Sequence, residues 1–191
     1  MYMKNNNRLL IFTLILIAVA TLCKFFFGPN LSWSGFSPVI AIAIFSGMLI
    51  NNKGKSFFLP LIAVFASDMI IELLFTFNLF PYSGFYTYQL FNYSLLLAAT
   101  LIGWMVKGKN YGSIAMGGII APTVFFLLSN LGSWVIDTYS LYTNDLNGLL
   151  TSYEAGLPFY RNALGATLLF LPAIMLCYNT MVKRSLVVKL A

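Results

Sequence analysis

The chain has 191 residues, of which 60% are hydrophobic and only 8% are charged, and its formal net charge is +6. These values exclude an ordinary soluble domain, in which about 25% of the residues are charged. Because a membrane-spanning helix needs about 20 predominantly apolar residues, six such helices and their loops occupy the whole chain and leave no room for a soluble catalytic domain.

Apolar stretches separated by polar turns predict six membrane-spanning helices in a single domain. In chain order they cover about residues 9–27, 37–50, 57–77, 90–106, 113–135 and 157–181. The second span is brief, so we expect either a nearly untilted helix or one that its flanking residues complete. A hydrophilic outer loop, residues 136–156, separates the last two spans. The predicted fold is an all-α integral membrane protein, a compact bundle of six transmembrane helices.

The positions of Lys and Arg predict the orientation of this bundle. Nine of the eleven basic residues precede the first span, follow the last, or lie between the second and third or the fourth and fifth spans. Short loops rich in Lys and Arg stay on the cytoplasmic side of a bacterial inner membrane, so we expect a multi-pass inner-membrane protein with both termini in the cytoplasm. The exceptions are Lys24, whose flexible side chain can reach the interface from the end of the first span, and Arg161. Basic residues in such positions are typical of anchoring beside anionic lipid and not of nucleic-acid binding.

Two carboxylates in the third span, Asp68 and Glu72, are the strongest local signal for a site. They lie four residues apart and therefore share one face of the helix. A rise of ~1.5 Å per residue places Asp68 near the middle of the membrane and Glu72 closer to its outer surface. Because an ionisable group at that depth costs at least ~2.5 kcal/mol, both should face the bundle interior and a partner. Three roles stay open: a structural pair with Arg161 or with Asn and Tyr side chains, contact with a substrate, and coupling to a proton or cation.

Further polar and aromatic residues fall on the outer half. The guanidinium of Arg161 suits a carboxylate or phosphate, either of a ligand or of the chain itself. Aromatic residues in the segment 78–93, together with Tyr139, Tyr142 and Tyr153, form either an interfacial belt or the lid and walls of a pocket for a flat organic ligand. The residues predicted to contact a substrate are Asp68, Glu72, Asn130, Trp134, Tyr153, Phe159, Arg161 and Asn162.

Several kinds of chemistry are missing from the sequence. The chain has no histidine, which excludes His-based acid–base catalysis and the commonest metal ligand. It has no P-loop and no Ser or Cys with a nearby base, so neither ATP hydrolysis nor covalent catalysis is expected. Cys23 and Cys177 fall at opposite ends of their spans, which argues against a disulfide. We therefore expect no enzymatic activity, no cofactor and no metal site.

Rows of small residues on three spans predict close approach of helix backbones, because packing in lipid depends on dispersion contacts. Such rows serve packing within this chain or docking to a second membrane protein. They are Ala43/Gly47, Ala99/Gly103 and Ser113/Gly117/Ala121.

Four segments resemble those of a known group of proteins. They are residues 36–47, residues 59–61 with Ser67 and Asp68, residues 125–134 and residues 148–159. In these segments the chain resembles a small family of uncharacterised bacterial membrane proteins. Through its six spans, cytoplasmic termini and outer-half site it also resembles the substrate-binding (S) components of energy-coupling factor (ECF) vitamin transporters.

The resemblance to S components implies a bundle that captures a small organic micronutrient, such as a vitamin, from outside. Such a bundle topples in the membrane against a transmembrane subunit driven by two ATPases. The first helix of many S components carries an Ala-x-x-x-Ala docking motif, whereas the first span here has only Ala18 and Ala20. Docking then uses another surface, or the protein works without the ATPase module. The alternatives are a proton-coupled carrier or carboxylate-dependent membrane enzyme that uses Asp68 and Glu72, and a structural or assembly protein without a ligand.

Overall fold

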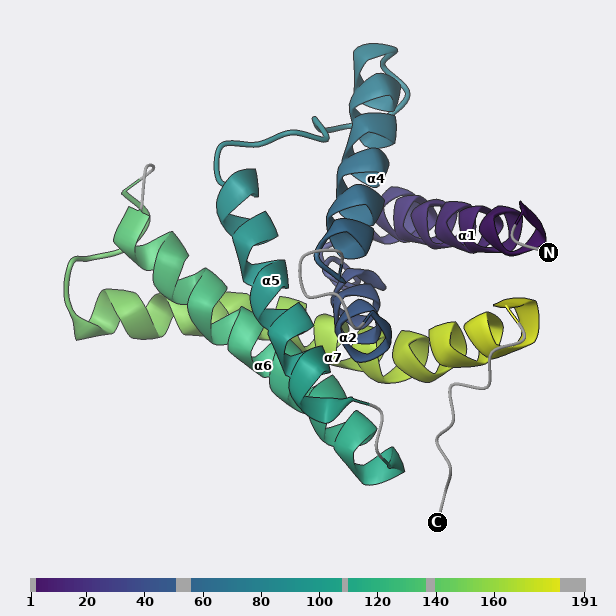
Figure 1. Ribbon diagram of the computed structural model, residues 1–191. Coiled ribbons are helices and arrows are strands. Elements are labelled where there is room, and N and C mark those ends of the chain that lie inside the picture. The colour runs from purple at the N-terminus through teal and green to yellow at the C-terminus, as the bar shows by residue number, and fades with distance from the viewer. Residues whose placement is uncertain (1–2, 51–55, 108–109, 137–139, 183–191) are drawn as a thin grey trace.

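The computed structural model describes residues 3–50, 56–107, 110–136 and 140–182, and these ranges contain helices and no strand (Figure 1). The helices are α1 (Met3–Phe27), α2 (Val39–Leu49), α4 (Phe58–Thr76), α5 (Gln89–Val106), α6 (Tyr111–Ile136) and α7 (Leu146–Val182). The prediction of an all-helical fold is confirmed.

Five of the described helices, all except α2, are long and apolar enough to cross a membrane. This composition identifies a multi-pass membrane protein. The largest difference from the predicted spans concerns α7, which begins at Leu146, so that the second half of the predicted outer loop is helical. With 37 residues α7 is ~55 Å long, well beyond the ~30 Å of the hydrocarbon core.

The second predicted span is a short central helix and not a lipid-facing one. α2 has 11 residues and is ~17 Å long, about half the thickness of the hydrocarbon core. It lies in the middle of the molecule and contacts α4, α5, α6 and α7, so every residue from Ile40 to Gly47 is buried (Figure 1). The start of α1 and the end of α7 lie on the same side of the molecule.

Two of the three predicted rows of small residues, Ala43/Gly47 and Ala99/Gly103, pack against each other within the chain. Where α2 crosses α5, a methyl group on Gly47 would lie 2.1 Å from the carbonyl oxygen of Thr100, and one on Gly103 would lie 2.2 Å from that of Ile44. The same end of the bundle holds a cluster of the Phe12, Phe45 and Tyr178 rings, whose centroids are 5.4–5.7 Å apart. We call this end, where α1 starts and α7 ends, the basal half. The opposite half, which we call the distal half, contains the other ends of these helices and of their neighbours: Phe27, Thr76, Gln89, Ile136 and Leu146.

Candidate functional site

Two hollows of about 470 and about 550 Å³ adjoin in the distal half. Each falls within the range of ~300–1,000 Å³ that is usual for small-molecule sites. Their walls have seven residues in common: Gly35, Ser37, Val39, Asn92, Leu96, Phe125 and Phe159. We therefore describe one cavity with two lobes, a smaller aromatic lobe beside α6 and α7 and a larger polar lobe beside α1 and α4.

The shortness of α2 makes room for this cavity. Because α2 begins only at Val39, the chain between α1 and α2 crosses the distal half as turns, and Ser34, Gly35 and Ser37 of this segment line the cavity. Asn162 of α7 holds the segment in place by donating hydrogen bonds of 2.9 Å to the carbonyl oxygens of Ser32 and Ser34. Non-helical backbone at membrane depth is tolerated where it is buried in protein or lines a cavity.

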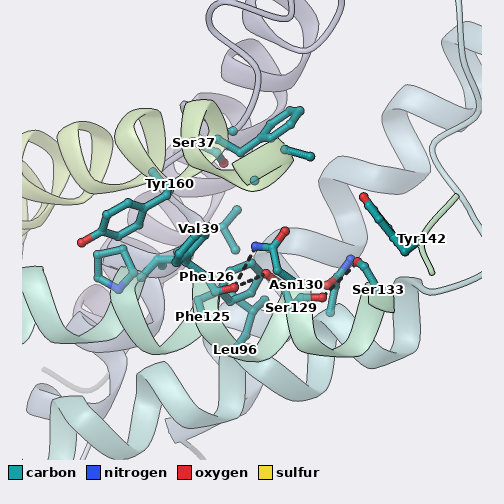
Figure 2. Close-up of a pocket in the computed structure, with 18 residues that line it drawn as sticks. Ser37, Val39, Leu96, Phe125, Phe126, Ser129, Asn130, Ser133, Tyr142 and Tyr160 are labelled. Atoms are coloured by element: carbon teal, nitrogen blue, oxygen red, sulfur yellow. Dashed lines mark hydrogen bonds between the residues drawn. The ribbon is translucent and has the colours of Figure 1, made fainter. Parts of the chain in front are cut away.

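Ser37 carries the polar atom that points most directly to a ligand. Its Oγ is buried and has no hydrogen-bond partner in the described part of the chain. Ser37 borders both lobes, and Figure 2 shows it above Val39 at the junction. A buried hydroxyl without a partner is costly, so this atom is suited to contact a bound molecule.

The polar lobe is organised around Asp68 of α4. Lys24 of α1 forms an ion pair with Asp68 Oδ1 and also donates to Ser67 Oγ at 2.7 Å. Asp68 Oδ2 accepts hydrogen bonds from Gln89 Nε2 at 2.6 Å and from the Tyr93 hydroxyl. The side chains of Lys24 and Asp68 are only 22% and 8% exposed. Both oxygens of the carboxylate are therefore already bonded within the protein.

This geometry corrects two expectations. Asp68 does not pair with Arg161: its ion pair is with Lys24, and Arg161 lies on an exposed face of α7, where it donates a hydrogen bond of 3.5 Å to the Ser32 carbonyl oxygen. Lys24 does not extend to the interface either, because α1 packs mainly against α4 and this contact directs the ammonium group to the carboxylate. The sequence offered one signal for the pair: Lys24 was, like Arg161, a basic residue on the side that carries the acids.

Glu72 has a separate role from Asp68, although the two lie one turn apart. Its Oε2 accepts hydrogen bonds from Ser83 Oγ at 2.5 Å and from the backbone N–H groups of Gly84 at 2.8 Å and Phe85 at 3.3 Å. The loop passes so close to α4 that a methyl group on Gly84 would lie 2.1 Å from the Asp68 carbonyl oxygen. Glu72 thus fastens the loop between α4 and α5 over the polar lobe.

Two tyrosines of this loop, Tyr82 and Tyr86, line the polar lobe, as the prediction of an aromatic lid requires. The hydroxyl of Tyr82 lies over Gly28, where an added methyl group would be 1.8 Å away. Tyr86 accepts a hydrogen bond of 2.8 Å from Asn92. Burial, and to a smaller extent the negative charge of Asp68, raise the pKa of Tyr86, so its phenol stays protonated and can donate.

The aromatic lobe is formed by residues one turn apart on α6 and by α7 (Figure 2). The rings of Phe126 and Tyr160 have centroids 4.8 Å apart and planes inclined by 31°. Asn130 donates from Nδ2 to the Phe126 carbonyl oxygen at 2.8 Å and faces Gly156 of α7, where an added methyl group would collide with its side chain at 2.3 Å. Apart from these polar atoms the lobe is mostly apolar.

The predicted site residues are distributed over several places. Asp68, Asn130 and Phe159 line the cavity, whereas Asn162 and Glu72 shape it through the loops they hold. Trp134 donates to the Thr143 carbonyl oxygen at 2.9 Å and Tyr153 to that of Leu127 at 3.2 Å, outside both lobes. Arg161 lines an open surface groove together with Glu154; the groove meets the aromatic lobe at Phe159 and Tyr160. Tyr142 lines the aromatic lobe, and Tyr139 lies outside the described residues.

Sequence reasoning missed Lys24, Ser37 and Gln89. Ser37 and Gln89 are uncharged and frequent in membrane helices and loops, so nothing in the sequence distinguished them. In the described ranges no group of three or more His, Cys, Asp or Glu side chains is arranged to hold a metal ion. Cys23 and Cys177 are both free, which agrees with the expectation that they form no disulfide.

Comparison with known proteins gives one result. The model of a family of unknown function, DUF6580, matches residues 3–189. No curated protein and no solved structure matched the chain. Nothing in these comparisons links the chain to the S components of ECF transporters. Because the match covers nearly all of its length, the chain belongs to the DUF6580 family.

Proposed function

We propose that this protein binds a small organic solute in its two-lobed cavity and takes part in the uptake of that solute across the membrane. The observation that carries the proposal is the unpartnered Ser37 hydroxyl, which is buried at the junction of two lobes of ligand size. Apolar walls with a few placed polar groups are the usual character of a small-molecule site.

The polar lobe supports the same proposal. An ion pair buried at membrane depth is costly, and residues of this kind in membrane helices commonly mark substrate pathways. Lys24 and Asp68 line the lobe and are not enclosed in packed protein. A purely structural role, in which the pair only joins α1 to α4, is the competing interpretation because α1 packs mainly on α4.

The direction of uptake is a further part of the proposal. The Lys/Arg pattern favours cytoplasmic termini, and the distal half would then face outward. The resemblance to S components suggests capture from outside and delivery through an ATPase-driven partner. A fluorescent protein fused after residue 191 tests the orientation, because it fluoresces in cells only if the C-terminus is cytoplasmic. If a reporter that works only in the periplasm is active when it is fused to the C-terminus, the proposed orientation is contradicted.

A matched pair of substitutions on α7 tests solute binding. Ala163 lines the aromatic lobe, whereas Ala173 lies on an exposed face of the same helix. Ala163→Phe should fill the lobe, and Ala173→Phe should only add a ring on the lipid side. The wild-type protein and both variants are purified in mild detergent, and extracted small molecules are identified by mass spectrometry.

We expect the wild-type protein and Ala173→Phe to carry the same organic molecule at about one per chain and Ala163→Phe to carry little. Cells that produce the wild-type protein should accumulate the labelled molecule, and cells that produce Ala163→Phe should not. Equal amounts in all three proteins, or none in any, would contradict binding in the cavity.

A further inference from the structure

The charges that line the cavity cancel. Lys24 and Asp68 are the only Lys, Arg, Asp or Glu among the described residues that line either lobe, and they form an ion pair with each other. Glu154 and Arg161, which carry opposite charges, line the surface groove that meets the aromatic lobe and do not line either lobe. A ligand with a net charge would therefore bring an uncompensated charge into a site of low dielectric constant, at a large cost in free energy.

The hydrogen-bonding groups left over in the polar lobe include donors on Lys24 and Tyr86. Both oxygens of Asp68 are already bonded, by Lys24 on one side and by Gln89 and Tyr93 on the other. An ammonium ligand would have to displace one of these bonds. The Lys24 ammonium has three N–H groups and uses two of them, on Asp68 and Ser67. The Tyr86 hydroxyl accepts a bond from Asn92 and keeps its own proton to donate. These donors call for an acceptor on the ligand.

The aromatic lobe sets the shape of the other end of the ligand. The rings of Phe126 and Tyr160 pack face against face on one side of the lobe, and Phe125 and Phe159 border the junction with the polar lobe. A flat ring on the ligand can add to this group of aromatic side chains in an offset-stacked or edge-to-face arrangement, which is worth more than its buried area alone. The unpartnered Ser37 hydroxyl lies where a ring and a polar group would meet.

We propose that the ligand is uncharged overall and has two parts: a flat ring for the aromatic lobe and a neutral acceptor, such as a carboxamide or ring carbonyl, for the polar lobe. This inference rests on the proposed function and narrows its substrate class. It excludes free carboxylates, phosphates and amines, unless opposite charges on one molecule cancel.

Matched sets of probes test the proposed preference for an uncharged ligand, which we call the charge rule. Each set has one two-ring system (naphthalene, indole or quinoline) that carries a carboxamide, a carboxylate or an aminomethyl group. Binding to the purified wild-type protein is measured at neutral pH by thermal-shift titration. We expect the carboxamides to bind at least ~10-fold more tightly than their charged counterparts, because a buried unpaired charge costs several kcal/mol.

The variant Asp68→Asn sharpens the test because it leaves Lys24 unpaired and gives the cavity one positive charge. We expect the preference to invert, so that carboxylates bind more tightly than carboxamides. If Asp68→Asn does not fold, the uncharged variant Lys24→Met/Asp68→Leu replaces it; it should bind the carboxamides more weakly than the wild-type protein does, but still more tightly than it binds either charged class.

The outcomes separate the two proposals. Tighter binding of carboxylates or amines to the wild-type protein overturns the charge rule and leaves the proposed function standing. If no probe binds, the charge rule is tested on the molecule that co-purifies with the protein. An uncharged compound with a ring supports the rule, and a charged compound or one without a ring overturns it. If no probe binds and nothing co-purifies, both proposals fail.

Discussion

The two ends of α2 lie in opposite kinds of surroundings. At its basal end, Gly47 packs so closely on α5 that a methyl group has no room. At its distal end, Val39 borders both lobes of the cavity. The cavity therefore arises because α2 is only about half as long as the hydrocarbon core is thick, and not because long helices splay apart. Small residues close the basal half, and turns and polar side chains line the distal half.

The largest effect is expected in the distal half, from Lys24→Met. This change leaves the buried Asp68 carboxylate without its charged partner, so the free energy of unfolding should fall by ~3–5 kcal/mol. The double variant Lys24→Met/Asp68→Leu removes both charges and should recover most of that loss. Thermal or denaturant unfolding in detergent measures the three proteins.

Binding of the co-purified molecule to the same three proteins then shows whether the Lys24–Asp68 pair serves the ligand or only joins α1 to α4. If the pair serves the ligand, the double variant should fold and yet lose most of its affinity for the co-purified molecule. A double variant as unstable as Lys24→Met would show that the distal half depends on its polar network for folding, and the contrast with the basal half would disappear.

A smaller effect is expected in the basal half, from Gly103→Ala. The added methyl group would lie 2.2 Å from the Ile44 carbonyl oxygen, so α2 and α5 must move apart, at a cost of ~1–3 kcal/mol. Gly165→Ala on α7 is the matched control, because no atom outside its own helix lies within 4 Å of the new methyl group. It should be neutral or stabilise by up to ~1 kcal/mol. Equal melting temperatures of the two variants would argue against the close crossing.

The smallest effect is expected at the distal rim, from Asp145→Asn. The Asp145 carboxylate accepts hydrogen bonds from Thr143 Oγ1 at 2.6 Å and from the Gly148 N–H at 2.8 Å, at the start of α7. These bonds lower the pKa of Asp145 below its ordinary value of 3.8. The stabilisation is therefore complete above the unfolded-state pKa and is lost as the pH falls through the lower, folded-state pKa.

Melting temperatures recorded from neutral to strongly acidic pH measure this contribution. Asp145→Asn should melt slightly below the wild-type protein at neutral pH, and the two should converge in acid. Glu154→Gln, on an exposed position of α7, is the control and should leave the melting temperature at neutral pH unchanged. A constant difference between Asp145→Asn and wild type at every pH would contradict the assignment.

The long helices could be predicted from the sequence because about 20 consecutive apolar residues have few other stable arrangements in a membrane. The start of α7 could not. Gly148 and Gly156 disfavour a helix interior, and the hydrophilic composition of this segment therefore favoured a loop. Tertiary contacts outweigh these propensities: Ser152 donates to the Asn130 carbonyl oxygen at 2.9 Å, and Gly156 packs directly on the Asn130 side chain.

The candidate site was also predictable only in part, because packing between helices decides which side chains meet. A carboxylate at the depth of Asp68 requires a partner, which the sequence indicates, but the choice of partner depends on how each helix is rotated about its axis. That rotation brings Lys24 to Asp68 and leaves Arg161 on an exposed face. Rotation is set by packing between helices, and no single-sequence pattern reports it.

The tether between α4 and the loop over the polar lobe has an evolutionary consequence. Gly84 lies against the backbone of Asp68, and the Glu72 carboxylate accepts hydrogen bonds from the consecutive N–H groups of Gly84 and Phe85. A side chain at position 84 would push the loop off the helix, and loss of the carboxylate at 72 would release it. We therefore expect the glycine at 84 and the carboxylate at 72 to be kept or changed together among members of the family.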